Sequence, residues 1–269
     1  MQVNTLRDSI AFRVFMTIPA RRWGNTSDLS PMKMRTHELL GTAAIPGNGG
    51  ELRFHKRGDD YAISVVGQDG DLMNSSVHGS EELLAEMALK RLISPLTARV
   101  LVGGLGMGFT LRAALNHTGP SAQVVVAELV PEVIEWNKGP MGEKAGNPMQ
   151  DPRALVRAGD VAAIIRERNE AYDTILLDTD NGPEGLTQND NRKIYSEAGI
   201  RAIHACLRPG GVLAVWSTHP NKPFTRRLGM GGFRVEEVQV PATGSKGTRH
   251  TLWFAKKRAV HSVDGSKRH

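Results

Sequence analysis

The sequence predicts a doubly wound α/β fold, in which a mostly parallel, seven-stranded sheet ends in an antiparallel hairpin. From residue 98 onward, short apolar runs alternate with helical patterns, which is the order that places parallel strands between helices. The strands are short apolar runs, as expected when helices cover both faces of a sheet. The link between the last two runs, residues 241–247, is too short for a crossover helix, so those strands should pair antiparallel.

Composition and periodicity divide the chain into four segments. The first contains scattered Arg and Pro without sustained periodicity, and we expect a poorly ordered leader there. Two strand-like segments follow around the turn at Gly58 and Asp59, which predicts a small β-hairpin unit. The expected boundaries are 1–45 for the leader, 46–78 for the β unit, 79–258 for the main domain and 259–269 for a disordered tail.

A helix predicted at about 81–92 opens the main domain. Ser80 is placed to cap its N-terminus, and Glu81 and Glu82 fall in its positively polarised first turn. The strands that follow are predicted at 99–103, 122–128, 154–158, 173–178, 211–216, 233–240 and 249–256. The helices between them are predicted at 107–117, 131–138, 160–168, 190–206 and 222–229.

Composition excludes several classes of protein. Cys206 is the only cysteine, which rules out an intramolecular disulfide and a multi-cysteine metal site. There is no apolar stretch of about 18 residues and no signal-peptide core, so we expect a reducing cytoplasm and no membrane. The net charge is +6, but the basic residues gather at the two ends and the centre is acidic. This distribution does not favour nucleic acid and suits a small cationic substrate.

A glycine-rich turn joins the first strand of the main domain to its helix. The residues of this turn are Gly103-Gly104-Leu105-Gly106-Met107-Gly108. Such a turn lets a ligand approach the backbone at a helix N-terminus. Phe109 occupies the position where a dinucleotide fingerprint requires glycine, which argues against a nicotinamide-dependent reductase. The shorter Gly-x-Gly-x-Gly spacing is usual in folds that bind S-adenosylmethionine (SAM), although a tight turn used only for packing is the alternative.

Acidic residues follow the next two strands. Glu128 ends the second strand, where a carboxylate can accept hydrogen bonds from both hydroxyls of a ribose; a solvent-facing acid is the alternative. Asp160, followed by Val161, comes after the third strand. Its carboxylate can cap the next helix, accept a hydrogen bond from an adenine amino group, or do both with one oxygen each.

Asp178 and Asp180 follow the fourth strand, at the edge where open α/β sheets bind ligands. In extended chain their side chains point to the same side, and their repulsion should raise the pKa of one of them. We therefore predict a general base here, suited to deprotonating an amine nucleophile; an acidic turn is the alternative. The histidines are scattered without a His-Glu-x-x-His pattern, so we predict no metal site.

Residues from about 70 to 256 resemble the spermidine synthase group of aminopropyltransferases, which share the Rossmann-like fold of class I methyltransferases. The matching blocks are Val100-Leu-Val-Gly-Gly-Leu-Gly-Met-Gly108, Glu128-Leu-Val-Pro-Glu-Val-Ile134, Asp151-Pro-Arg153 with Gly159-Asp160, Tyr172-Asp-Thr-Ile-Leu-Leu-Asp178 and Leu207-Arg-Pro-Gly-Gly-Val-Leu213. The resemblance implies a nucleotide pocket lined by the glycine turn, Glu128 and Asp160. It also implies Asp178 beside the attacking amine, a role in polyamine biosynthesis and a homodimer.

The sequence departs from the family pattern at several positions. Gly106 stands where the family carries an acid that holds the amino end of decarboxylated SAM, and Leu84 replaces a tyrosine that helps to place the amine. Asn74 takes the place of the Gln expected before the first helix, and we include it among the nucleotide-binding candidates. The family's Asp-x-x-Asp is shortened, so the second acidic role falls on Asp180 or on Asn181.

Three functions are consistent with these residues. The first is aminopropyl transfer from decarboxylated SAM to a di- or polyamine, with Asp178 as the base and Asp180 as its helper. Because Gly106 removes a carboxylate that would repel the carboxylate of SAM, the second is transfer of a methyl or 3-amino-3-carboxypropyl group from SAM to a small amine. The third is a catalytically silent binding protein of the same fold.

Overall fold

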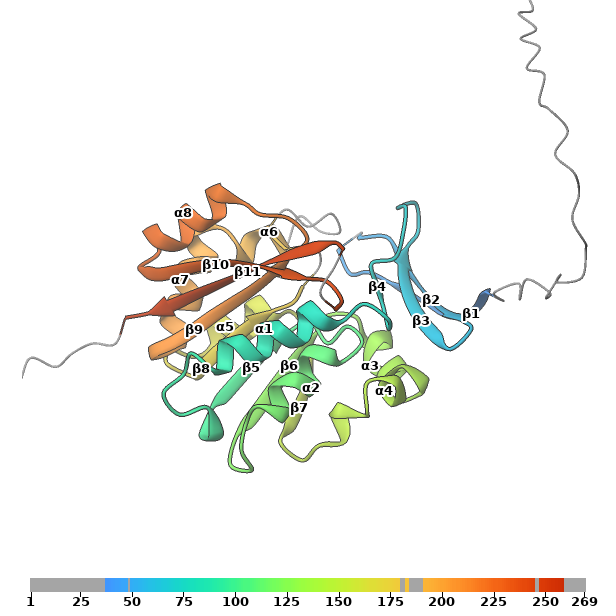
Figure 1. Ribbon diagram of the computed structural model, residues 1–269, viewed down its shortest axis with the longest axis horizontal. Helices are drawn as coiled ribbons and strands as arrows, with labels where there is room; N and C mark the ends of the chain where they lie inside the picture. Colours follow the sequence, from blue (N-terminus) through green and yellow to red (C-terminus); the bar gives the residue numbers. More distant parts are fainter. Residues whose placement is uncertain (1–36, 48, 180–181, 184–190, 245–246, 259–269) are drawn as a thin grey trace, which may run out of the picture. The chain divides into compact units, whose positions relative to one another are not determined.

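The structure, a computed structural model, describes residues 37–258 except 48, 180–181, 184–190 and 245–246. The strands among these residues form two sheets (Figure 1). The smaller one is antiparallel in the order β1-β2-β3-β4, with bounds β1 His37–Ala44, β2 Glu51–Arg57, β3 Asp60–Val65 and β4 Met73–Asn74. Within the described part of the chain, no helix is long and apolar enough to cross a membrane.

Strand β1 lies inside the segment for which we expected a poorly ordered leader, so that expectation is wrong for residues 37–44. β1 pairs antiparallel with β2 along its length, with one irregularity between Leu39 and Gly41. The sequence of β1 shows no strand-like alternation because Ala43 is its one buried residue. Gly41 allows β1 to approach Trp136, whose Nε1 would lie 2.8 Å from a Cβ added at this glycine.

The larger sheet confirms the predicted doubly wound α/β fold. Its strand order is β10-β11-β9-β8-β5-β6-β7; the five strands from β9 to β7 run parallel, and β11 and β10 form the antiparallel end. The bounds are β5 Arg99–Gly103, β6 Gln123–Glu128, β7 Ala154–Ala158, β8 Tyr172–Leu177, β9 Leu207–Ser217, β10 Phe233–Pro241 and β11 Arg249–Lys257. The chain builds outward from β5 through β6 to β7 and then returns to β8 on the other side of β5. Ligands of such sheets bind at this reversal point.

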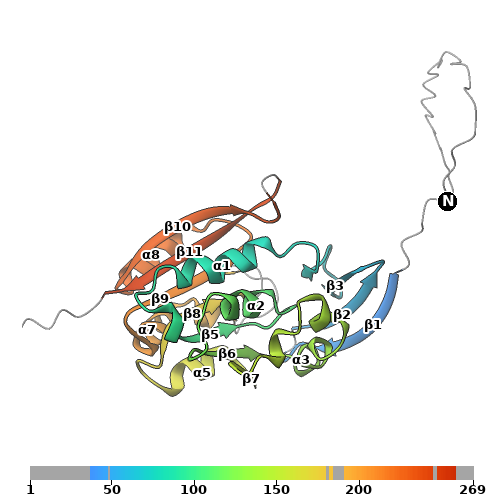
Figure 2. The ribbon, with the colours of Figure 1, turned by 60° about the horizontal axis from the view of Figure 1, so that its bottom comes forward.

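Helices cover both faces of the larger sheet because alternate residues of each strand point to opposite sides (Figures 1 and 2). Along β5, Val100 and Val102 pack in one core with α1 and α2, whereas Leu101 packs in the other with α5, α7 and α8. The bounds of the helices are α1 Gly79–Leu89, α2 Phe109–Asn116, α3 Pro131–Asn137, α4 Pro140–Lys144, α5 Val161–Glu167, α6 Asn191–Ile194, α7 Glu197–Cys206 and α8 Lys222–Met230.

Two helix boundaries differ from the prediction. α1 begins one residue before Ser80, so Ser80 lies inside the helix and the expected cap is wrong. The buried Ser80 hydroxyl lies 2.8 Å from His250 Nδ1 and accepts a hydrogen bond from Trp216 Nε1 at 3.0 Å, which ties α1 to β11 and β9. The helix expected at 190–206 is divided into α6 and α7, because the side chain of Ser196 caps the N-terminus of α7.

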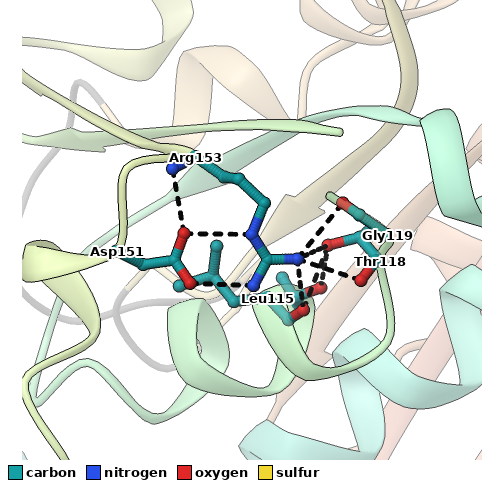
Figure 3. Close-up of polar contacts among 6 residues, drawn as sticks. Leu115, Thr118, Gly119, Asp151 and Arg153 are labelled. Carbon is teal, nitrogen blue, oxygen red and sulfur yellow. Dashed lines mark hydrogen bonds and ion pairs between the residues drawn. The ribbon is translucent and has the colours of Figure 1, made fainter. Parts of the chain in front are cut away.

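Arg153 holds two loops of the larger domain together (Figure 3). Its Nη1 donates to the carbonyl oxygens of Leu115, Thr118 and Gly119 at 3.0, 2.9 and 3.2 Å. Its Nε and Nη2 donate to the two carboxylate oxygens of Asp151 at 3.0 and 2.8 Å. The Asp-Pro-Arg block therefore fixes the approach to β7 against the C-terminal end of α2.

Replacement of Arg153 by Ala is expected to lower the free energy of unfolding by about 2–4 kcal/mol, because partly buried carbonyl groups lose their donor. Urea unfolding measures this change. Arg157→Ala is the matched control: Arg157 pairs with Glu167 through two hydrogen bonds on an exposed surface, and such pairs contribute little. Equal effects of the two substitutions would contradict the structural role given to Arg153.

Candidate active site

A pocket opens at the carboxyl ends of four parallel strands, beside the point where the strand order reverses. Four of its lining residues come from these ends: Gly104 follows β5, Glu128 ends β6, Asp160 follows β7 and Asp178 follows β8. The smaller sheet supplies apolar side chains to the lining, among them Met73 of β4. The pocket thus combines three carboxylates with an apolar wall, as small-molecule sites commonly do.

The glycine turn adopts backbone angles that other residues rarely reach. Gly104, Gly106 and Gly108 have φ values of +91°, +52° and +86°. A Cβ on Gly104 would lie 2.4 Å from the carbonyl oxygen of Asp178, so the ends of β5 and β8 approach too closely for a side chain. Gly104 and Gly106 line the pocket, whereas Gly103 ends β5 and Gly108 precedes the first residue of α2 without lining it.

Glu128 is 8% exposed, which excludes the alternative of a solvent-facing acid. Its Oε2 accepts a hydrogen bond from the backbone N–H of Leu105 at 2.9 Å, and its Oε1 accepts one from Val130 N–H at 2.9 Å. These two bonds fix the carboxylate between the glycine turn and the start of α3.

Asp160 caps helix α5, which was one of its two expected roles. Its Oδ1 accepts a hydrogen bond from the backbone N–H of Ala162 at 2.8 Å. Asp160 and Val161 both line the pocket. The recognition of an adenine amino group by the same carboxylate stays a prediction.

Asp178 lies half-buried at the pocket, directly after β8. Thr110, a buried residue of the first turn of α2, donates a hydrogen bond from Oγ1 to Asp178 Oδ2 at 2.5 Å. Burial raises the pKa of Asp178 to about 6, and the bond from Thr110 opposes this rise. A carboxylate with a pKa close to neutrality suits reversible proton transfer. Thr110 was not among the residues predicted from the sequence, although a hydroxyl just after the glycine turn was a usable signal.

A second carboxylate, Glu81, interacts electrostatically with Asp178. Glu81 belongs to the first turn of α1, a helix that contacts α2 and β8. Burial raises the pKa of Glu81 well above its usual range, the charges of Asp178 and Glu82 add to this rise, and Arg112 opposes it. We expected Glu81 only to favour the start of the helix. Repulsion of this kind disfavours the state in which both carboxyl groups are ionised.

Asn137 supports the glycine turn from the C-terminal end of α3, and sequence analysis missed it. The residue is 2% exposed, and its Nδ2 donates to the carbonyl oxygens of Gly106 at 2.8 Å and Val133 at 2.9 Å. These bonds use both hydrogens of the amide group. An isolated Asn at a helix end gives no sequence signal of such a role.

The remaining candidates do not reach the pocket or lie outside the described residues. Asn74 is in β4, does not line the pocket, and accepts hydrogen bonds at Oδ1 from the backbone N–H and hydroxyl of Ser76 at 3.2 and 2.9 Å. Asp180 and Asn181 fall outside the residues that the structure describes. Among the described residues, no group of three or more His, Cys, Asp and Glu side chains is arranged to hold a metal ion.

Comparisons with known proteins show which family this chain resembles in sequence. Residues 77–225 match the spermine/spermidine synthase domain family. Polyamine aminopropyltransferase 2 of Pseudomonas aeruginosa is 31% identical over 56% of this chain and 42% of its own length. The polyamine aminopropyltransferase of Korarchaeum cryptofilum is 30% identical over 55% of this chain and 44% of its own length. The chain thus spans less than half of the length of either relative.

A solved structure shows a similar fold. Spermidine synthase from Thermotoga maritima superposes with a TM-score of 0.65 at 20% sequence identity, over 82% of this chain and 73% of that chain. The likeness is one of overall fold.

Proposed function

The chain belongs to the spermine/spermidine synthase family, and we propose that it transfers an aminopropyl group from decarboxylated SAM to a di- or polyamine. The observation that carries this proposal is the position of Asp178, whose carboxylate lines the pocket beside Gly104 and receives a hydrogen bond from Thr110. The names of the two relatives support the class of reaction. A cytoplasmic location and a homodimer stay predictions.

We propose that the nucleotide of the donor lies along the carboxyl ends of β5, β6 and β7. In this arrangement Glu128 accepts hydrogen bonds from the ribose hydroxyls, and Asp160 uses the oxygen that does not cap α5 to accept one from the adenine amino group. Val161 gives the adenine ring an apolar contact. Gly104 and Gly106 leave the backbone open to the sulfonium end of the donor.

The proposed reaction is a displacement at the carbon attached to the sulfonium. The acceptor enters as an ammonium ion, and Asp178 takes one proton from it, which exposes the lone pair of the nitrogen. The N–C bond forms as the C–S bond breaks, and the electron pair of the broken bond stays on sulfur, giving neutral methylthioadenosine. Because this leaving group is good, the protein mainly orients the reactants and accepts the proton.

The pH dependence of transfer tests the role of Asp178. Because only the ionised carboxylate accepts a proton, kcat/KM should fall as pH drops through the Asp178 pKa of about 6. Thr110→Val removes a hydrogen bond that favours the ionised form of Asp178. The pH below which kcat/KM falls should therefore rise by about one pH unit. Steady-state kinetics at acidic pH measures this change in wild type and variant. If kcat/KM falls over the same pH range in Thr110→Val and in wild type, the hydrogen bond from Thr110 does not influence the base.

A second candidate function rests on Gly106. No carboxylate stands at this turn position, and a Cβ added there would lie 3.4 Å from Met73 Sδ. SAM carries a carboxylate on its tail, and Gly106 places no like charge near that carboxylate. Transfer of a methyl or 3-amino-3-carboxypropyl group from SAM to a small amine is therefore the alternative.

Calorimetric titration with decarboxylated SAM and, separately, with SAM distinguishes the two candidates. The first proposal predicts tighter binding of decarboxylated SAM. Tighter binding of SAM would overturn it in favour of the alternative, and the by-product would then separate methyl transfer, which gives S-adenosylhomocysteine, from carboxypropyl transfer, which gives methylthioadenosine.

A further inference from the structure

Thr179 lines the pocket directly after the proposed base, and the two branches of its side chain have different neighbours. The residue is half-buried and shares the lining with Asp178 and Gly104. Its hydroxyl oxygen Oγ1 lies 2.9 Å from the phenol oxygen of Tyr195, where either group can donate the hydrogen bond. Its methyl carbon Cγ2 lies 3.6 Å from the position of a Cβ added to Gly104. The hydroxyl therefore points to Tyr195, and the methyl group lies on the side of the glycine turn.

Tyr195 is held firmly behind the pocket wall. It stands in the turn between α6 and α7 and is 2% exposed. Its ring meets the ring of Phe224 edge-on, with centroids 5.6 Å apart and an angle of 89° between the planes. Its backbone carbonyl oxygen accepts a hydrogen bond from Arg227 Nη1 at 3.0 Å. Tyr195 is not one of the described residues that line the pocket, so its phenol reaches the pocket through Thr179.

The backbone that leads into Thr179 is fixed as well. The N–H of Asp178 donates to the carbonyl oxygen of Gly103 at 3.0 Å, which joins it to the end of β5. The carboxylate of Asp178 accepts the hydrogen bond from Thr110 of α2. With the backbone held in this way, the main freedom left to Thr179 is rotation about χ1 among three staggered positions. Each such rotation moves the methyl group and the hydroxyl to new places.

The hydrogen bond to Tyr195 selects one of these positions. A hydroxyl that is buried without a partner is costly, so the bond favours the rotamer that sends the hydroxyl away from the pocket. The methyl group then faces the side of Gly104. Met73 extends the apolar surface, because its Sδ lies 3.4 Å from the position of a Cβ added to Gly106. A methylthio group suits such a surface, since a thioether sulfur is a weak hydrogen-bond acceptor.

We propose that Tyr195 is a positioning residue of the donor site: its phenol orients Thr179 so that the methyl group of Thr179, and not its hydroxyl, contacts the sulfur end of the donor. This inference rests on the proposed function, in which the sulfonium end of the donor lies at Gly104 and Gly106. Tyr195 does not touch the donor and acts through Thr179.

Tyr195→Phe, made in two backgrounds, tests the proposal. The substitution removes the phenol oxygen, so the hydroxyl of Thr179 turns into the pocket, where a bound ligand buries it. The probe is methylthioadenosine, which carries the methylthio end and requires no amine. Its dissociation constant, measured by calorimetric titration, should rise on the order of tenfold in the wild-type background. In the Thr179→Val background no hydroxyl is present to turn, so the same substitution should change the constant by less than about twofold.

A purely structural role of Tyr195 gives a different result. Tyr195→Phe would then weaken binding equally in the two backgrounds, and that outcome would overturn the inference. An unchanged dissociation constant in the wild-type background would overturn it as well. Tyr172→Phe is the matched control, because it removes the phenol oxygen of a buried tyrosine at the opposite end of β8 from the pocket. It should leave the dissociation constant unchanged.

Thr179→Ser tests the contact of the methyl group with the donor. Serine keeps the hydroxyl that Tyr195 holds and lacks the methyl group, so the dissociation constant of methylthioadenosine should rise roughly fourfold, the usual effect of one buried methyl group. Binding as tight as that of the wild type would show that the methyl group does not contact the sulfur end, and it would overturn the inference.

Transfer by the wild type separates failure of the inference from failure of the proposed function. The wild type is incubated with decarboxylated SAM and a panel of diamines and polyamines. Transfer to one of these amines, together with equal losses of affinity in the two backgrounds, would overturn the role of Tyr195 and leave the proposed function standing. Absence of transfer to every amine of the panel would overturn the proposed function, and the inference with it.

Discussion

Asp178→Asn is expected to lower kcat for transfer by roughly 10²–10⁴-fold, the usual contribution of a general base. The substitution keeps the shape of the side chain, and its amide oxygen can still accept the hydrogen bond that Thr110 donates to Asp178. What it removes is the ability to take a proton from the attacking ammonium. Single-turnover measurements with decarboxylated SAM and a diamine report this step directly.

Donor binding serves as the control for Asp178→Asn. The residues proposed to hold the nucleotide are Glu128 and Asp160, so the dissociation constant of methylthioadenosine should stay close to that of the wild type. A variant that binds the nucleotide and transfers at the wild-type rate would show that Asp178 is not the base. A variant that no longer binds the nucleotide would show instead that the substitution disturbs the glycine turn.

Gly104→Ala should have the largest effect of any glycine substitution at the pocket. The added Cβ would lie 2.4 Å from the carbonyl oxygen of Asp178, and the φ of +91° is unfavourable for any L-residue with a side chain. Backbone strain and overpacking together predict a loss of about 2–5 kcal/mol in the free energy of unfolding. Because β5 and β8 must separate to admit the methyl group, donor binding and the position of the base should both suffer.

Gly58→Ala is the matched control for Gly104→Ala. Gly58 also has a positive φ, +65°, but nothing lies within 4 Å of a Cβ added there. It should therefore show backbone strain alone, of roughly 1 kcal/mol, with unchanged donor binding. Urea unfolding and nucleotide titration of the two variants separate strain from contact. Equal losses would contradict the close approach between Gly104 and Asp178.

The sequence was sufficient to predict the centre of the larger sheet because strands β5, β6 and β8 are buried on both faces. Each appears as a short apolar run, and every predicted strand of this sheet lies within a few residues of an observed one. The pocket residues Gly104, Glu128, Asp160 and Asp178 were identifiable for a related reason: each stands where a parallel strand of this sheet ends. Strand β1 was missed because it buries one residue and so lacks the pattern that burial imposes.

The supporting residues of the site could not be predicted because they act through contacts between distant segments. Thr110 contacts the residue that follows β8, and Asn137 contacts the glycine turn, from two different helices. Ser80 is the opposite case, because the sequence predicted a role for it that the structure does not show. Its position before an acidic helical turn predicted a cap, but a buried hydrogen-bond network with residues 136 and 170 positions away in the sequence holds its hydroxyl.

The central claim, that the chain is an aminopropyltransferase, is tested most directly by the identity of the products. The purified protein is incubated with a diamine and an equal mixture of decarboxylated SAM and SAM, and the products are identified by mass spectrometry. We predict a diamine extended by one aminopropyl group, together with methylthioadenosine, and no consumption of SAM. A methylated amine with S-adenosylhomocysteine, and decarboxylated SAM left unused, would contradict the claim.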